Sequence, residues 1–271
     1  MSFFQALAEQ SFLQWALVAG LLAALSSGVV GTLVVLKRIT FMAGGIAHAV
    51  LGGMGVAHWL GYSPLGGAAV AAVMAALAVG WISRKGGERE DMLIGALWAV
   101  GMAVGIVAIA HTPGYSTDLM SYLLGNLLMV SPEHVAWMLM LNAVIVLTLL
   151  LLWRPIVASI FDEEFARLRG IPTFAIELAL LVIVALCVVL LVQAVGLVLV
   201  MALITLPAAT ALLLSSSLAR IMAIATLLAA AEIVFGLGLA FETDSPAGAV
   251  IVLASAAVYL VVLAIQRLRS H

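Results

Sequence analysis

Long apolar stretches constrain this chain more than any other feature. They recur along the whole sequence, each about 20 residues long, with short polar segments between them. A helix of that length crosses the ~30 Å hydrocarbon core of a bilayer, where an open chain cannot leave backbone polar groups unpaired. The sequence therefore predicts an all-α integral membrane protein, a polytopic helical bundle. The expected spans are residues 12–36, 44–61, 65–83, 92–110, 134–153, 174–193, 195–214, 219–241 and 247–265.

The number of complete spans is open at one place. Windows 174–193 and 195–214 are separated only by a tight turn near Gly196, and Pro207 interrupts the second window. Eight full spans with broken pieces is the alternative to nine. A further segment, 121–130, is too short to cross a bilayer and is expected to form a short helix at the outer face.

Composition excludes several classes of protein. Asp, Glu, Lys and Arg make up only 9% of the 271 residues, against about 25% in a soluble domain. No soluble domain fits, so residues 1–271 are expected to form a single transmembrane domain. No basic patch exists that could bind nucleic acid, so no nucleic-acid partner is expected. The single Cys187 lies in an apolar span, so no disulfide framework is expected. Neither a phosphate-binding GxxxxGK[ST] loop nor an HExxH motif occurs, so the chain is not expected to be an enzyme.

The distribution of positive charge predicts the orientation. If the N-terminus is placed outside and the spans alternate, all 11 Lys and Arg residues fall on one side. Positively charged loops are retained in the cytoplasm. The chain is therefore expected to have its N-terminus outside and its C-terminus in the cytoplasm. The first apolar stretch is too long for a signal-peptide core, and we interpret it as a retained span.

The densest charge cluster is the segment 161–172, FDEEFARLRGIP, which reads as one short helix on the cytoplasmic side. Asp162 is placed to cap its start, Gly170 to close it in the left-handed conformation, and Pro172 to prevent its continuation. Acidic and basic residues follow the order that the helix dipole favours: Glu163, Glu164, Arg167 and Arg169. One apolar stripe remains, formed by Phe161, Phe165 and Leu168.

Such a helix either lies on the lipid surface or docks into a partner protein. Helices that bind a lipid surface usually carry Lys and Arg on their polar face. This one has three acidic residues against two arginines, which disfavours anionic lipid. The segment is therefore expected to dock into a cytoplasmic protein.

Two ionisable residues lie deep within expected spans. His48 is about 15 Å along a helix from Arg38, and Glu232 is about 18 Å from Arg220, so both lie near the bilayer midplane. A charged group there costs at least ~2.5–3.5 kcal/mol, which makes a functional role worth considering. The structural alternatives are a neutral histidine bonded to a carbonyl and a protonated carboxyl that cross-links helices.

Small residues surround His48 on its helix. Gly44 and Gly52 share its face, with Gly45, Ala49 and Gly53 alongside. We call these five residues the glycine face. It either lets another helix approach closely or leaves a channel with His48 in its wall. Other histidines and acidic residues gather at the outer ends of spans, and such ligands suit a divalent cation such as zinc: His58, His111, His134, Asp118, Glu133, Glu242 and Asp244.

Five runs of the sequence, in order, resemble the membrane permease subunits of bacterial metal-uptake ABC transporters. They are GTLVVLKRITFMAGGIAHAVLGGMGVA, TDLMSYLLGNLLMVS, FDEEFARLRGIP, VGLVLVMALITLPAATA and DSPAGAVIVL. The resemblance implies a fold of the type II ABC importer kind in the bacterial inner membrane. It also implies a homodimer with one central path, two cytoplasmic ATPase subunits and an extracytoplasmic metal-binding protein. By this resemblance, segment 161–172 is the coupling helix that inserts into the ATPase.

The chain departs from the family pattern at one position. Many members carry an aspartate four residues before the histidine of the second span, where this chain has Gly44. Manganese favours oxygen ligands, and this position lacks one, so zinc is the expected cargo, with manganese or iron as alternatives. We expect a metal path through His48 and Glu232, with Asp118 and Asp244 at its entrance, and no permanently bound cofactor.

Two other functions remain open at the level of the sequence. The first is an ABC permease for a metal chelate or haem, because a broad glycine face would suit a larger cargo. The second is a cation-coupled secondary transporter that uses His48 and Glu232 as its relay and needs no ATPase.

Overall fold

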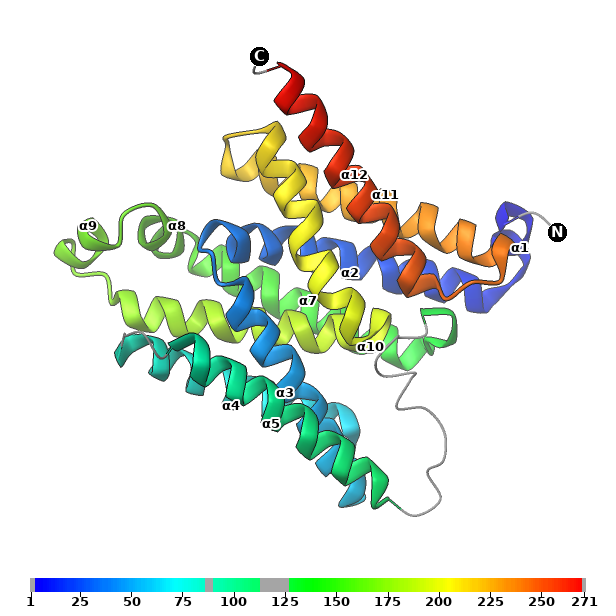
Figure 1. The fold of residues 1–271 in the computed structure, drawn as a ribbon, viewed down its shortest axis with the longest axis horizontal. Helices are drawn as coiled ribbons and strands as arrows, with labels where there is room; N and C mark the ends of the chain where they lie inside the picture. Colours follow the sequence, from blue (N-terminus) through cyan, green and yellow to red (C-terminus); the bar gives the residue numbers. More distant parts are fainter. Residues whose placement is uncertain (1–2, 86–89, 113–126, 270–271) are drawn as a thin grey trace. The chain divides into compact units, whose positions relative to one another are not determined.

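The computed structural model describes residues 3–85, 90–112 and 127–269, and within these ranges all regular structure is helical (Figure 1). The elements in chain order are α1 (Phe3–Glu9), α2 (Ser11–Leu36), α3 (Thr40–Trp59), α4 (Pro64–Lys85), α5 (Glu90–Ala110), the 3₁₀ turn η1 (Leu127–Met129), α7 (Pro132–Leu151), α8 (Trp153–Phe161), α9 (Glu163–Leu168), α10 (Thr173–Leu214), α11 (Leu218–Thr243) and α12 (Ala247–Arg269).

In these ranges, nine segments are long and apolar enough to cross a membrane, and they coincide with the nine expected spans to within a few residues. The predicted all-α membrane fold is confirmed. Most of the segment 121–130, expected to form a short outer helix, lies outside the described residues, which resume with η1.

Helix α10 is 42 residues long and contains one break. Gly196 has φ 77° and ψ 165°, a backbone conformation that L side chains rarely adopt, so the expected turn at this position is present. Pro207, in contrast, does not end the helix. Thr205 and Thr210 lie on either side of it, and their hydroxyls donate to the carbonyls of Met201 and Leu206 at 2.7 and 2.8 Å. Hydroxyl bonds of this kind help a membrane helix to tolerate proline.

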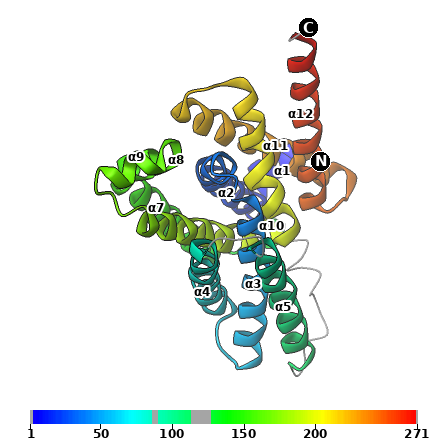
Figure 2. The same cartoon turned by 60° about the vertical axis from the view of Figure 1, so that its left-hand side comes forward.

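The chain divides into two compact units. The first comprises residues 1–35, 120–142 and 190–271, and the second comprises residues 36–119 and 143–189. In the first unit, α11 and α12 pack together, and the Nδ2 of the buried Asn142 on α7 donates to the carbonyl of Leu22 on α2 at 3.2 Å. In the second unit, α3 packs against both α4 and α5 and lies between them (Figures 1 and 2).

Candidate functional site

His48 projects from α3 and is partly buried. Its ring stacks on the indole of Trp98 from α5, with centroids 4.1 Å apart and planes inclined by 16°. Its Nδ1 is buried and has no hydrogen-bond partner among the described residues. The carbonyl-bonded histidine considered above is therefore not what the structure shows at Nδ1.

The glycine face brings other helices close. A Cβ on Gly52 would lie 2.7 Å from the carbonyl oxygen of Gly101 on α5. Just beyond the glycine face, a Cβ on Gly55 would lie 2.6 Å from the carbonyl oxygen of Gly105, also on α5. Real Cβ atoms essentially never approach so closely, so these contacts require glycine. On another side of α3, Gly53 meets α4. The structure therefore shows close helix packing at Gly52 and Gly53, while a channel with His48 in its wall stays a prediction.

Glu232 lies on α11 in the first unit and is only 4% exposed. Its Oε2 accepts a hydrogen bond from the hydroxyl of Ser255 on α12, and its Oε1 is buried without a partner in the described part of the chain. The bond joins two helices, as the structural alternative expected. The carboxyl nevertheless keeps one oxygen unsatisfied, which is unusual for a purely structural group.

Asp244, one of the two predicted entrance residues, is not assembled with Glu232. Asp244 is exposed and ends α11 in the left-handed conformation with φ 52°, while its N–H donates to the carbonyl of Ala240. It lies three helical turns, or roughly 18 Å, beyond Glu232. Asp118 lies outside the described residues. Among the residues that are described, no three His, Cys, Asp or Glu side chains are grouped so that they could hold one ion.

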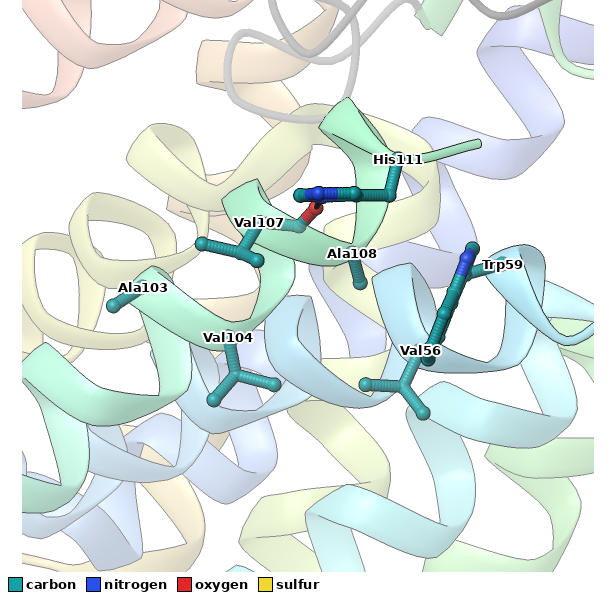
Figure 3. Close-up of a pocket in the computed structure, with 7 residues that line it drawn as sticks. All are labelled: Val56, Trp59, Ala103, Val104, Val107, Ala108 and His111. Atoms are coloured by element: carbon teal, nitrogen blue, oxygen red, sulfur yellow. Dashed lines mark hydrogen bonds between the residues drawn. The ribbon is translucent and has the colours of Figure 1, made fainter. Parts of the chain in front are cut away.

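The C-terminal ends of α3 and α5 form an apolar pocket of about 580 Å³ (Figure 3). Its lining includes Val56, Trp59, Val104 and Val107, and His111 is the one ionisable group in it. The Nδ1 of His111 lies 2.8 Å from the carbonyl of Val107 on its own helix. His134, similarly, lies 2.8 Å from the hydroxyl of Ser131. Each of these two histidines is thus held locally.

The charged segment folds with the expected caps. The side chain of Asp162 accepts from the N–H of Phe165 at 2.8 Å, and Glu163 forms an ion pair with Arg167 at 3.2 Å. Gly170 has φ 78°, its N–H donates to the carbonyl of Arg167, and the following N–H of Ile171 donates to that of Ala166. These two hydrogen bonds are the pattern of a helix that ends at a glycine.

The predicted boundaries of this helix were too wide. Asp162 has an extended backbone with φ −152° and ψ 92°, so the helix α9 begins after it and covers only Glu163–Leu168. Phe161 is instead the last residue of the preceding helix α8. A residue that caps a helix takes a non-helical conformation, which is why Asp162 separates the two helices.

The apolar stripe of this segment is exposed. The relative accessibilities are 66% for Phe161, 50% for Phe165 and 83% for Leu168. Within α9 only Ala166 is buried. The guanidinium of Arg169 lies 5.0 Å from the centre of the Phe165 ring. The segment therefore presents apolar side chains framed by charges.

A comparison with family models assigns the chain to a family. The model of the ABC 3 transport family matches residues 9–266. The chain belongs to the ABC 3 transport family. It is accordingly a membrane permease subunit and not itself an enzyme, as the absence of a phosphate-binding motif predicted.

Relatives and solved structures agree with this family. An uncharacterised membrane protein of Synechocystis is 40% identical over 96% of this chain and 92% of its own length. The manganese transport system membrane protein MntC of Halalkalibacterium halodurans is 36% identical over 70% of this chain and 65% of its own. A structure of PsaBC from Streptococcus pneumoniae superimposes with a TM-score of 0.88 at 30% identity, covering 96% of this chain and 94% of that one.

These findings confirm the expected fold of an ABC importer permease and the metal-uptake class. Sequence reasoning missed two residues of the candidate site, Trp98 and Ser255. The sequence does carry a signal for Trp98. His48 and Trp98 lie the same number of residues after the first residues of their helices, Thr40 and Glu90. On parallel spans this places them at the same depth, although it does not show that their faces meet.

Proposed function

We propose that this chain is the permease of an ATP-driven importer that carries a divalent transition-metal ion, with zinc as the preferred cargo. Membership of the ABC 3 family supports the transporter class. The observation that carries the cargo assignment is His48, a partly buried imidazole within a span whose Nδ1 has no protein partner in the described residues. An imidazole nitrogen without a hydrogen-bond partner in an apolar span costs free energy, so its presence there supports a functional role.

A transported ion must be released as well as bound. A complete cage of four protein ligands would retain zinc as a structural metal. The described residues supply no such cage within one chain, and one imidazole from each of two permeases would form a partial site on a shared path. We therefore propose a homodimer with His48 from each copy on the path. Glu232 would neutralise charge on the path, while Asp118 and Asp244 would attract the cation at the entrance.

Zinc is preferred in this proposal because of the ligand type. Imidazole suits zinc, whereas manganese favours oxygen donors, and the residue one turn before His48 is Gly44 rather than a carboxylate. We expect deletion of the chain to lower zinc uptake more than manganese or iron uptake in cells supplied with each metal at limiting concentration. Re-expression of the chain should restore zinc uptake. Loss of manganese uptake alone would contradict the assignment of zinc.

The exposed stripe of Phe161, Phe165 and Leu168 supports the proposed coupling role. In an ABC importer the energy comes from a separate ATPase, so some surface of the permease must dock with it. Large apolar side chains exposed beside charges are typical of a protein interface. We propose that α9 and its flanking residues dock with the ATPase, and that an extracytoplasmic protein delivers the metal to the opposite face.

The proposed orientation can be tested by labelling from outside the cell. Arg169 is exposed at the C-terminal end of α9. Tyr62 is 71% exposed and follows the C-terminal end of α3. We expect Tyr62→Cys to react with an impermeant thiol reagent in intact cells and Arg169→Cys to react only after lysis. The native Cys187 is buried, so the unmodified chain provides the background. Labelling of Arg169→Cys in intact cells would reverse the proposed topology.

A further inference from the structure

We propose that Trp98 is a positioning residue of the metal path: its indole holds the His48 imidazole in one orientation and thereby favours zinc over manganese. This inference deepens the proposed function and depends on His48 being a ligand for the transported ion. It rests on three features of the second unit: the ring stack, the unpartnered Nδ1 and the close packing of α3 against α5.

The first feature is the stack itself. The rings of His48 and Trp98 are nearly parallel, at 16°, and their centroids are 4.1 Å apart. Phe41 lies two helical turns before His48 on α3, and its ring centre is 6.2 Å from that of Trp98. The indole therefore contacts an aromatic side chain in addition to the imidazole, which restricts its own rotation.

The second feature is the absence of the usual restraint on a ligating histidine. Such a histidine almost always donates its other ring N–H to a carboxylate, a carbonyl or water, and this bond sets the ring orientation. With Nε2 as the ligating nitrogen, Nδ1 is the atom that would make this bond, and in His48 it is buried without a protein partner in the described residues. With no hydrogen bond from Nδ1 to hold the ring, the face of Trp98 is the contact that determines its plane.

The third feature fixes the position of Trp98. Gly101 lies one turn further along α5, and a Cβ built on it would be 2.7 Å from the Cα of Ala49 on α3. On the other side of the stack, Gly45 of α3 faces Ile94 of α5. The two backbones are thus held close just before and just after the stacked pair, so the backbone positions that carry the indole and the imidazole cannot move apart without separating the helices.

An imidazole held in one orientation should favour the binding of some cations over others. Zinc gains more than manganese from a nitrogen ligand, so a loss of ring orientation should weaken zinc transport more. Immobilising one side chain before binding is worth about 3- to 10-fold in affinity. The stack should therefore raise the ratio of zinc to manganese transport by a factor of that order.

The test compares uptake of the two metals by cells that express variants of the complete transporter. Trp98→Phe keeps an aromatic face, Trp98→Leu keeps only apolar bulk, and Trp137→Leu removes a 49% exposed tryptophan from α7 as a control. The external metal-binding protein is the same in every strain, so a change in the ratio arises in the permease. We expect Trp98→Leu to lower the zinc-to-manganese ratio about 3- to 10-fold, and Trp98→Phe and Trp137→Leu to stay within about twofold of the native ratio. An unchanged ratio in Trp98→Leu, at a normal amount of chain in the membrane, would overturn the proposal.

A spectroscopic measurement separates positioning from general packing. In the purified full-length chain labelled with 5-fluorotryptophan, the ¹⁹F resonance of Trp98 is the one missing from Trp98→Phe. We expect it to shift on His48→Gln substitution and on addition of zinc to the native chain, but not on addition of zinc to His48→Gln. A resonance that ignores both changes would contradict the stack as a functional contact, even if Trp98→Leu folds poorly.

The failure of this inference can be told apart from failure of the proposed function. Normal zinc uptake in His48→Ala would show that His48 is not on the path, and both proposals would fall. Loss of uptake in His48→Ala together with a native ratio in Trp98→Leu would overturn only the role of Trp98.

Discussion

Replacing His48 by alanine is expected to lower metal uptake by about 10- to 100-fold or more, because the path loses its imidazole ligand. The amount of chain in the membrane and its association with the ATPase should not change, since His48 is only partly buried and α3 is held by glycine contacts elsewhere. Uptake of labelled zinc measures the effect. His134→Ala is the matched control, because that ring contacts Ser131 near the start of α7. Normal uptake in His48→Ala would remove the proposed site altogether.

The same uptake measurement on Glu232→Gln tests the carboxyl in the first unit. The change keeps the shape of the side chain, and the amide oxygen can still accept from Ser255, but it removes the ability to carry charge. We expect reduced uptake if the unpartnered Oε1 neutralises the passing cation. Native uptake in Glu232→Gln would assign the carboxyl to the cross-link between α11 and α12 and exclude it from the path.

The second large effect is expected at α9. Changing both Phe165 and Leu168 to aspartate should abolish association with the ATPase while the chain remains inserted in the membrane. Burial of each side chain in a partner groove contributes about 1.5–3 kcal/mol, so the pair accounts for roughly a hundred-fold or more in affinity. Both are exposed in the isolated chain, at 50% and 83%, which is why the change should not disturb its own fold.

Co-purification of the ATPase with the intact chain measures this effect. The double variant Phe165→Leu, Leu168→Met preserves apolar area and should keep the complex. Survival of the complex after the double aspartate change would show that α9 is not the docking element.

The spans and the charged helix could be predicted because their signals are local. Apolar length predicts each span, and the caps at Asp162 and Gly170 depend on neighbours within one turn. The boundary error at Phe161 has the same local origin. Its apolar periodicity continues that of α9, but the extended backbone of Asp162 places it in α8.

The contacts of the candidate site could not be predicted in the same way. Helices that are apolar on every side carry no periodic signal for which face meets which neighbour. The sequence therefore could not predict that α5 is the helix that packs against Gly52. The stack of Trp98 on His48 and the bond from Ser255 to Glu232 join residues far apart in sequence, and only the packing of the helices brings them together.

The most direct test of the central claim is metal uptake into liposomes that contain the purified permease with its ATPase, with the metal-binding protein outside and ATP trapped inside. We predict zinc accumulation that requires both enclosed ATP and the binding protein, and that is unaffected when the proton gradient is collapsed. The same liposomes containing His48→Ala should accumulate no zinc above background. Uptake that continues without ATP and follows an imposed proton gradient would contradict the account and identify a cation-coupled transporter instead.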